Sequence, residues 1–285
     1  MTQASSTTFS TIFSAQTAQI ILKPETTAFI FDIDGVLRDV SGSYRRALAD
    51  TVAHFTQDLS QAADKTGYRP TPQDIDRLKA EGLWNNDWEA SAELIRRYFV
   101  AHPEQVQPEI SYGQIVDFFQ RRYRGQVLDD PAQWDGYITT EPLIAHPAYF
   151  AGLTEAGIRW GFFSGATRGS ASYVLSRLGV TGAVLVAMED APGKPDPTGL
   201  LTAVSQLEAG IPIEIVVYVG DTAADILAAV AAQKADPSRQ YLGVGVIPPH
   251  ITPDEEPDYA AMLQQNGAAV VCQRILAVTA DGLFS

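Results

Sequence analysis

The most informative stretch of the sequence is Phe29-Ile30-Phe31-Asp32-Ile33-Asp34-Gly35-Val36-Leu37. An apolar run over residues 28–31 leads directly into two aspartates spaced i, i+2. A continuous apolar run of this length is typical of a buried strand in a parallel sheet, and Gly35 ends it. We therefore predict a strand over residues 28–33 that carries two carboxylates at its carboxyl end.

The positions of Asp32 and Asp34 suggest a functional role. Ligands of open α/β sheets bind beyond the carboxyl ends of the strands, where these two residues emerge. Because alternate strand residues point to opposite faces, Asp32 and Asp34 share a side while Ile33 turns into the core. Carboxylates at such a place require a cation, a shared proton or a catalytic task. Taken alone, the pair is equally consistent with an ordinary strand-to-loop pair of aspartates.

Composition narrows the class of protein. The chain has 285 residues, of which 46% are hydrophobic, enough for one large domain or for a core with an inserted module. A net charge of −14 disfavours nonspecific binding to nucleic acid or to anionic membranes. Cys272 is the only cysteine, which favours a reducing, cytoplasmic setting, although a cysteine-poor exported protein is an alternative. No apolar run approaches the length of a membrane span.

The first part of the chain divides into a tail and a helical insertion. Residues 1–24 lack the basic start and the apolar stretch of a secretory signal, and we expect a flexible N-terminal tail. After the first strand, apolar residues recur at steps of three and four, which is typical of amphipathic helices. Four helices are predicted to begin near Ser43 (as N-cap), Pro70-Thr71-Pro72, Asn86 and Ser111. Residues 41–144 are therefore predicted to form an all-helical inserted module.

From Pro142 onward, strand and helix patterns alternate. Predicted helices cover residues 147–156, 168–178, 198–208 and 223–232. Predicted strands cover residues 159–163, 183–187, 213–219, 241–246 and 268–272. Repeated β-α units of this kind predict an α/β fold with a doubly wound parallel sheet, a Rossmann-like core formed by residues 25–40 and 145–285.

The second predicted strand ends in Ser164-Gly165, directly before a helix. Gly165 allows the backbone to approach a ligand closely, and the free N–H groups at the start of the helix can bind an anion. The alternative is that Ser164 only caps the helix.

Two further segments place charged residues in a loop and at the end of a predicted strand. In Pro192-Gly193-Lys194-Pro195-Asp196-Pro197, Pro and Gly stiffen a loop around one lysine, although a solvated loop lysine is the simpler alternative. The strand of residues 213–219 delivers Asp221 at its tip, and Asp225 follows four residues later. The alternative for these two aspartates is an N-cap residue and a surface residue.

Together these segments resemble the four motifs of the haloacid dehalogenase (HAD) superfamily. Asp32-x-Asp34-Gly-Val is similar to its first motif, Ser164 to its second, Lys194-Pro-x-Pro to its third and Gly-Asp221-x-x-x-Asp225 to its fourth. All four occur in the family's order, each after a predicted strand. The resemblance covers residues 25–40 and 145–285, and the insertion resembles the helical cap of subfamily IA.

The segment that follows the first motif, and residues 84–88, resemble a little-characterised subgroup of that branch. Sequences like it have been labelled imidazoleglycerol-phosphate dehydratase. That label fits poorly, because the dehydratase needs His-rich metal motifs. The four histidines of this chain are scattered at His54, His102, His146 and His250.

The resemblance implies a magnesium-dependent phosphatase that acts on a small phosphorylated metabolite. Asp32 would attack phosphorus and form an aspartyl-phosphate, and Asp34 would act as general acid and base. Mg²⁺ would be bound by Asp32, the backbone carbonyl of Asp34, Asp221 and Asp225, the last directly or through water. Ser164, Lys194 and the backbone of Gly165 would surround the phosphoryl oxygens. The haloacid dehalogenases and phosphonatases lack an aspartate at position 34.

The resemblance assigns substrate choice to the helical cap. Candidate substrate-binding residues there are Arg45, Arg46, Trp84, Asn85, Asn86 and Trp88. The alternative is that the tryptophans pack within the module. In the core, Arg168 is a candidate for binding an anionic group, and a surface salt bridge is its alternative. A phosphomutase with the same motifs and a non-catalytic binding protein remain alternative functions, and the sequence predicts no oligomeric state.

Overall fold

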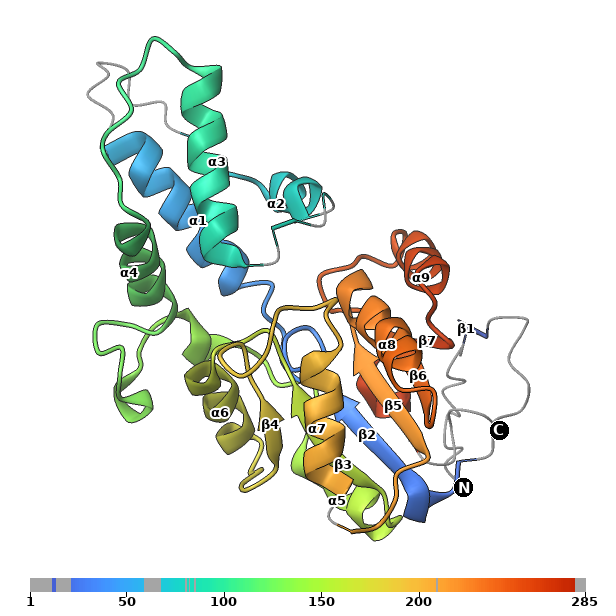
Figure 1. Ribbon diagram of the computed structural model, residues 1–285. Coiled ribbons are helices and arrows are strands. Elements are labelled where there is room, and N and C mark those ends of the chain that lie inside the picture. Colours follow the sequence, from blue (N-terminus) through green and yellow to red (C-terminus); the bar gives the residue numbers. More distant parts are fainter. Residues whose placement is uncertain are drawn as a thin grey trace, which may run out of the picture. The chain divides into compact units, whose positions relative to one another are not determined.

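The computed structural model describes residues 12–13, 22–58, 68–79, 81, 83–84, 86–208 and 210–279. The chain divides into two compact units (Figure 1). We call Met1–Asp39 with Leu143–Ser285 the core unit, and Val40–Pro142 the helical unit. Most of the predicted flexible tail, residues 1–24, lies outside the described residues.

The described part of the core unit contains a seven-stranded sheet in the order β1-β7-β6-β5-β2-β3-β4. Its strands are β1 (Ile12–Phe13), β2 (Thr27–Phe31), β3 (Arg159–Phe163), β4 (Val184–Val186), β5 (Ile215–Gly220), β6 (Gln240–Val246) and β7 (Val270–Cys272). The strands β2–β7 are parallel to their neighbours, which confirms the predicted parallel sheet. The sequence did not indicate β1, which pairs antiparallel with β7.

Strand β2 occupies the middle of the sheet, between β3 and β5 (Figure 1). All five of its residues are buried, as its uninterrupted apolar run requires. Ile30 lies beside Gly161 of β3 and Tyr218 of β5. The strand ends at Phe31, two residues earlier than predicted, because the N–H groups of Leu37 and Arg38 both bond the carbonyl of Ile33 and close a turn there.

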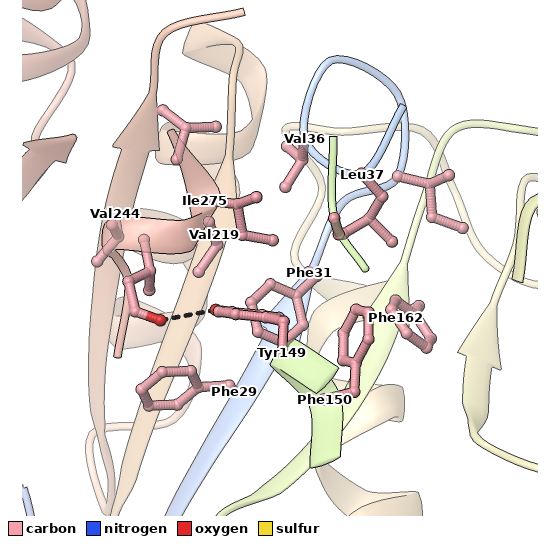
Figure 2. Close-up of a cluster of buried hydrophobic side chains, with 14 of the residues drawn as sticks. Phe29, Phe31, Val36, Leu37, Tyr149, Phe150, Phe162, Val219, Val244 and Ile275 are labelled. Carbon is pink, nitrogen blue, oxygen red and sulfur yellow. Dashed lines mark hydrogen bonds between the residues drawn. The ribbon is translucent and has the colours of Figure 1, made fainter. Parts of the chain in front are cut away.

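Helices cover both faces of the sheet. They are α5 (Pro147–Glu155), α6 (Arg168–Arg177), α7 (Thr198–Glu208), α8 (Ala223–Ala235) and α9 (Glu256–Gln265), with short 3₁₀ turns at Pro24–Thr26 and Ile275–Ala277. Phe29 and Phe31 pack with α5 and α6 in one hydrophobic cluster (Figure 2), whereas Ala28 and Ile30 pack with α7 and α8 in another. This alternation along β2 is the strand periodicity of two.

The helical unit contains only helices and turns among its described residues, as predicted for the insertion. They are α1 (Tyr44–Ala53), a π-helical turn (His54–Asp58), α2 (Pro72–Lys79), α3 (Asp87–Ala101), α4 (Tyr112–Tyr123) and 3₁₀ turns at Pro131–Gln133 and Tyr137–Thr140. Asn86 caps α3 and Ser111 forms a capping box with Gln114 at the start of α4.

Ser43 occupies the predicted N-cap position of α1, but its side chain does not cap the helix. Ser43 precedes α1, but its hydroxyl bonds Glu141 and the carbonyl of Val40 rather than the N–H groups of the first turn. Ser43 has φ −119° and ψ −72°, in the αR region and not in the extended region typical of a capping residue, so its Oγ does not accept from the N–H groups of the first turn.

Among the described helices, none combines the length and the apolar character that crossing a bilayer would require.

Candidate active site

The sheet brings the predicted site residues of the core unit to one edge. Asp32 follows β2, Ser164 follows β3 and Asp221 follows β5, and these three strands are neighbours. Lys194 lies in the loop between β4 and α7, and Asp225 lies in the first turn of α8. Because the carboxyl ends of parallel strands meet at the same edge, residues distant in sequence become adjacent there.

Three carboxylates form a buried cluster. Asp32, Asp221 and Asp225 each offer an oxygen, and these oxygens all lie within 4.8 Å of one another. The backbone N–H of Asp32 donates to the carbonyl of Val219 at 2.9 Å, which fixes the end of β2 against β5. Hard oxygen ligands at this spacing suit Mg²⁺, so the cluster could hold a metal ion.

Glycine is required where the backbone meets this cluster. Gly35 has a φ of +75°, and a Cβ there would lie 2.1 Å from Oδ2 of Asp221. A Cβ at Gly220 would lie 2.2 Å from Cβ of Asp225. Both distances are far inside van der Waals contact, so any other residue would displace the carboxylates.

Lys194 supplies positive charge to the cluster. Its Nζ lies 3.0 Å from Oδ1 of Asp32 and 2.6 Å from Oδ1 of Asp225. The side chain is 9% exposed, so it is not the solvated loop lysine of the simpler alternative. The ammonium therefore joins the aspartate that follows β2 to the aspartate at the start of α8.

Burial dominates the electrostatics of the site. It raises the pKa of Asp32 to about 6, against the opposing charge of Lys194. Burial, Asp225 and Asp32 raise the pKa of Asp221 well above its usual value. Burial also acts to raise the pKa of Asp225, but the charge and hydrogen bonds of Lys194 and Thr222 hold it below its usual value. Burial acts to lower the pKa of Lys194, whereas Asp225 and Asp32 raise it well above normal. Asp32 and Asp221 thus lack sufficient positive charge nearby, which favours the binding of a cation.

Asp34 is held apart from this cluster by Arg38. Nε of Arg38 donates to Oδ1 of Asp34 at 2.6 Å, and Nη2 lies 2.6 Å from the same oxygen. The arginine side chain is fully buried, whereas that of Asp34 is 25% exposed. The sequence did not indicate this i, i+4 pair, because an arginine after a strand is ordinarily expected to face solvent.

Ser164 is buried and does not cap the helix that follows. Its Oγ accepts a hydrogen bond from the N–H of Ala166 at 3.2 Å. Thr167 caps α6 instead, and the N–H of Arg168 donates to Glu189 at 2.9 Å. Part of the predicted anion site at this helix start is therefore occupied by a carboxylate. Gly165 is exposed, and a Cβ there would meet nothing within 4 Å.

The Arg168 guanidinium forms the salt bridge that was its alternative. It pairs with Asp190, and one of its nitrogens lies 3.4 Å from the carbonyl of Leu185. Arg168 and Asp190 line a surface pocket of about 560 Å³ beside the edge strand β4. A role of Arg168 in binding substrate remains a prediction.

The candidate cap residues all lie in the helical unit. Arg45 pairs with Asp76, and the indole N–H of Trp84 donates to Glu81 at 3.0 Å. Trp84 precedes α3, whereas Trp88 lies in its first turn. The side chains of Arg46 and Tyr137 stack, with 4.2 Å between the guanidinium carbon and the ring centroid. Asn85 lies outside the described residues, and the substrate-binding role of the whole group remains a prediction.

Three residues at the site were not singled out from the sequence. Tyr218 donates to Oδ1 of Asp225 at 3.0 Å, and the Tyr259 hydroxyl donates to the carbonyl of Asp221 at 2.9 Å. Thr222 caps α8 and forms a capping box with Asp225. The interpretation of Asp221 as N-cap and Asp225 as a surface residue is therefore wrong. The Thr-x-x-Asp spacing could have revealed the capping box. Nothing in the apolar run around Tyr218 indicated the contact of its hydroxyl with Asp225.

Comparison with known proteins adds to this geometry. A family model described as haloacid dehalogenase-like hydrolase matches residues 26–233. A Phytophthora nicotianae protein named imidazoleglycerol-phosphate dehydratase is 28% identical over 252 residues, which are 86% of this chain but 49% of that protein. The chain thus spans about half the length of this curated relative.

Two further proteins resemble the chain over most of its length. A phosphoglycolate phosphatase from Agrobacterium fabrum is 26% identical over 211 residues, 73% of this chain and 77% of that protein. The crystal structure of a phosphonoacetaldehyde hydrolase-like protein from Oleispira antarctica has a TM-score of 0.62 at 18% identity, covering 92% of this chain and 93% of that one. A likeness at this level of identity shows a shared fold.

Proposed function

Because the chain belongs to the haloacid dehalogenase-like hydrolases, we propose that it is a magnesium-dependent phosphatase that hydrolyses a small phosphate monoester through an aspartyl-phosphate intermediate. The observation that supports this most strongly is the buried group of Asp32, Lys194 and Asp221, with Asp34 two residues after the candidate nucleophile. The phosphoglycolate phosphatase that resembles the chain also supports a phosphate ester as substrate.

The charges at the site fit a divalent cation. Among the described residues, the site holds four carboxylates and two cations, so its net charge is −2 when all of them are ionised. The carboxylates are those of Asp32, Asp34, Asp221 and Asp225, and the cations are Lys194 and Arg38. Asp32, Asp221 and the backbone carbonyl of Asp34 would hold Mg²⁺, with Asp225 bound directly or through water. The ion, when bound, would offset the charge of the phosphoryl group and orient it.

The side chains themselves supply the rest of the chemistry. A carboxylate oxygen of Asp32 bonds phosphorus while the bond from phosphorus to the leaving oxygen breaks. Asp34, which takes up a proton from solvent before this step, gives that proton to the leaving oxygen. Asp34 then takes a proton from water, which attacks phosphorus, releases inorganic phosphate and restores Asp32. Lys194, Ser164 and the backbone N–H of Gly165 would offset and position the phosphoryl oxygens.

A panel of phosphate esters with Mg²⁺ present tests this proposal. It includes p-nitrophenyl phosphate together with phosphoglycolate and imidazoleglycerol phosphate, the esters named in the two relatives. We expect release of inorganic phosphate from at least one ester. A bisphosphorylated sugar intermediate with slow release of phosphate to water would indicate a phosphomutase instead, and no turnover of any ester would favour a binding protein.

Removal of Mg²⁺ is expected to abolish turnover, and Ca²⁺ is expected to inhibit it. Calcium accepts more ligands in looser geometry, which would disturb in-line attack at Asp32. The metal should also stabilise the fold, by about 2.7 kcal/mol at a hundred times its dissociation constant. Activity is measured after chelation and after Mg²⁺ is restored, and the unfolding midpoint is measured with and without Mg²⁺. Full activity after exhaustive chelation would contradict the metal assignment.

We also propose that residues 41–144 act as a cap that sets substrate preference. Arg45→Ala or Trp84→Ala should change kcat/KM for some esters of the panel, with less effect on p-nitrophenyl phosphate, because remote binding energy helps only substrates that possess the remote group. Asp76→Asn serves as the control for Arg45, since it breaks the same ion pair and keeps the guanidinium. A uniform loss for all esters would assign these residues to structure or general closure, and no change would place them outside the site.

A further inference from the structure

Asp225 is the most enclosed carboxylate of the site, and its contacts use all of its acceptor positions. Oδ1 accepts hydrogen bonds from Nζ of Lys194 at 2.6 Å and from the hydroxyl of Tyr218 at 3.0 Å. Oδ2 accepts from the N–H of Thr222 at 2.9 Å and from its hydroxyl at 2.6 Å. An ionised carboxylate offers about four lone-pair positions. A direct bond from Asp225 to a metal would therefore require one of these contacts to break.

The ammonium group of Lys194 lies between two carboxylates. It donates a hydrogen bond to Oδ1 of Asp225 at 2.6 Å, and its Nζ forms an ion pair with Oδ1 of Asp32 at 3.0 Å. The ring centroids of Phe163 and Tyr218 lie 5.2 Å and 5.7 Å from Nζ. A lysine carries a point charge on a flexible stem, so its place beside Asp32 depends on these neighbours.

The hydroxyl of Tyr218 is not needed to fill the core. Its ring packs in the cluster of Ala28, Ile30 and Phe163, where a phenylalanine would occupy the same space. The hydroxyl lies within reach of two acceptors, Asp225 and the carbonyl of Phe163 at 3.1 Å, but it has only one proton to donate. The charged carboxylate is the stronger acceptor, so the hydrogen bond to Asp225 takes precedence.

We propose that Tyr218 is a positioning residue: its hydroxyl fixes the carboxylate of Asp225 and, through it, holds Lys194 beside Asp32. Asp225 then serves as the counter-ion of Lys194 and not as a direct metal ligand. The inference rests on the proposed function in so far as Lys194 and Asp32 act on a phosphoryl group.

Tyr218→Phe removes only the hydroxyl, and Tyr149→Phe is its matched control. Tyr149 is a buried tyrosine of the other hydrophobic cluster (Figure 2), and its hydroxyl donates to the carbonyl of Val278 at 2.7 Å. We measure kcat, KM and the Mg²⁺ concentration for half-maximal activity of each variant. For Tyr218→Phe we expect kcat to fall roughly tenfold, equivalent to about 1.4 kcal/mol, with KM and the Mg²⁺ requirement unchanged. Tyr149→Phe should match the wild type.

A second readout does not depend on activity. Acetic anhydride labels accessible lysines, and the labelling of Lys194 is followed by mass spectrometry of its peptide. Lys194 should label several-fold faster in Tyr218→Phe than in the wild type or in Tyr149→Phe. The reason is that Asp225, which holds the ammonium group, loses the hydrogen bond that Tyr218 donates to it.

The outcomes separate the inference from the proposed function. Unchanged kcat and unchanged labelling in Tyr218→Phe would overturn the inference, and so would an equal loss in Tyr149→Phe. A raised Mg²⁺ requirement that accompanies the loss of kcat would assign Asp225 to the metal and overturn its assignment to Lys194. Faster labelling of Lys194 in a protein that turns over no phosphate ester would support the positioning role and reject the phosphatase.

Discussion

Asp32→Asn is expected to lower kcat by more than a hundredfold while the protein remains folded. An amide does not attack phosphorus, and a lost acid or base alone would cost on the order of 10²–10⁴. The substitution also removes one of three buried carboxylates whose oxygens lie within 4.8 Å of one another, so the unfolding midpoint without Mg²⁺ should not fall. The measurements are kcat on the best ester of the panel and thermal unfolding in the absence of metal.

Asp254→Asn is the control for this prediction, since it removes an exposed carboxylate of the core unit outside the site. It should leave both kcat and the unfolding midpoint unchanged. Should Asp32→Asn retain more than about a hundredth of the wild-type kcat, the nucleophile must be sought elsewhere.

Lys194→Met is expected to destabilise the fold and to abolish turnover together. It leaves Asp32 and Asp225 buried without their shared cation, and the loss of one partner of a buried ion pair costs about 3–5 kcal/mol. Adding Asp225→Asn should restore most of the stability, because it removes one of the two stranded charges. It should not restore turnover, since the ammonium beside Asp32 is still missing. Urea unfolding and kcat of the single and double variants measure the two effects.

Lys234→Met provides the comparison, because Lys234 is exposed on α8. Its substitution should change the free energy of unfolding by less than about 0.5 kcal/mol. If Lys194→Met were as stable as Lys234→Met, the ammonium would not be the counter-ion that its distances to Asp32 and Asp225 indicate.

The sheet could be predicted from the sequence because its central strands are continuous apolar runs that alternate with helical patterns. The predictions for β3 and α7 match the observed bounds. Helix α9 escaped prediction because it buries only Ala260 and Leu263, a stripe too narrow to produce a clear periodicity. The pairing of β1 with β7 involves two residues on each strand and leaves no pattern in the sequence.

In the candidate site, too, some residues could be predicted from the sequence and others could not. Residues whose spacing and residue type are unusual, such as Asp32 with Asp34 or Lys194 between prolines, stand out in the sequence. Tyr218 does not, because a tyrosine within an apolar run is ordinary strand composition. Its contact with Asp225 depends on the path of α8 after β5, and the pairing of Arg38 with Asp34 depends on the turn at Gly35, neither of which is encoded in a local pattern.

The central place of β2 has a consequence for the synthesis of the chain. β2 is the first of the parallel strands to leave the ribosome, but its two neighbours, β3 and β5, begin at Arg159 and Ile215. At roughly 5–20 residues per second, the nascent strand waits on the order of ten seconds or more for both partners. The helical unit ends at Pro142, so all of it has been made before either partner exists. A ribosome that stalls between Arg159 and Ile215 would therefore carry Thr27–Phe31 with at most one of its two neighbouring strands.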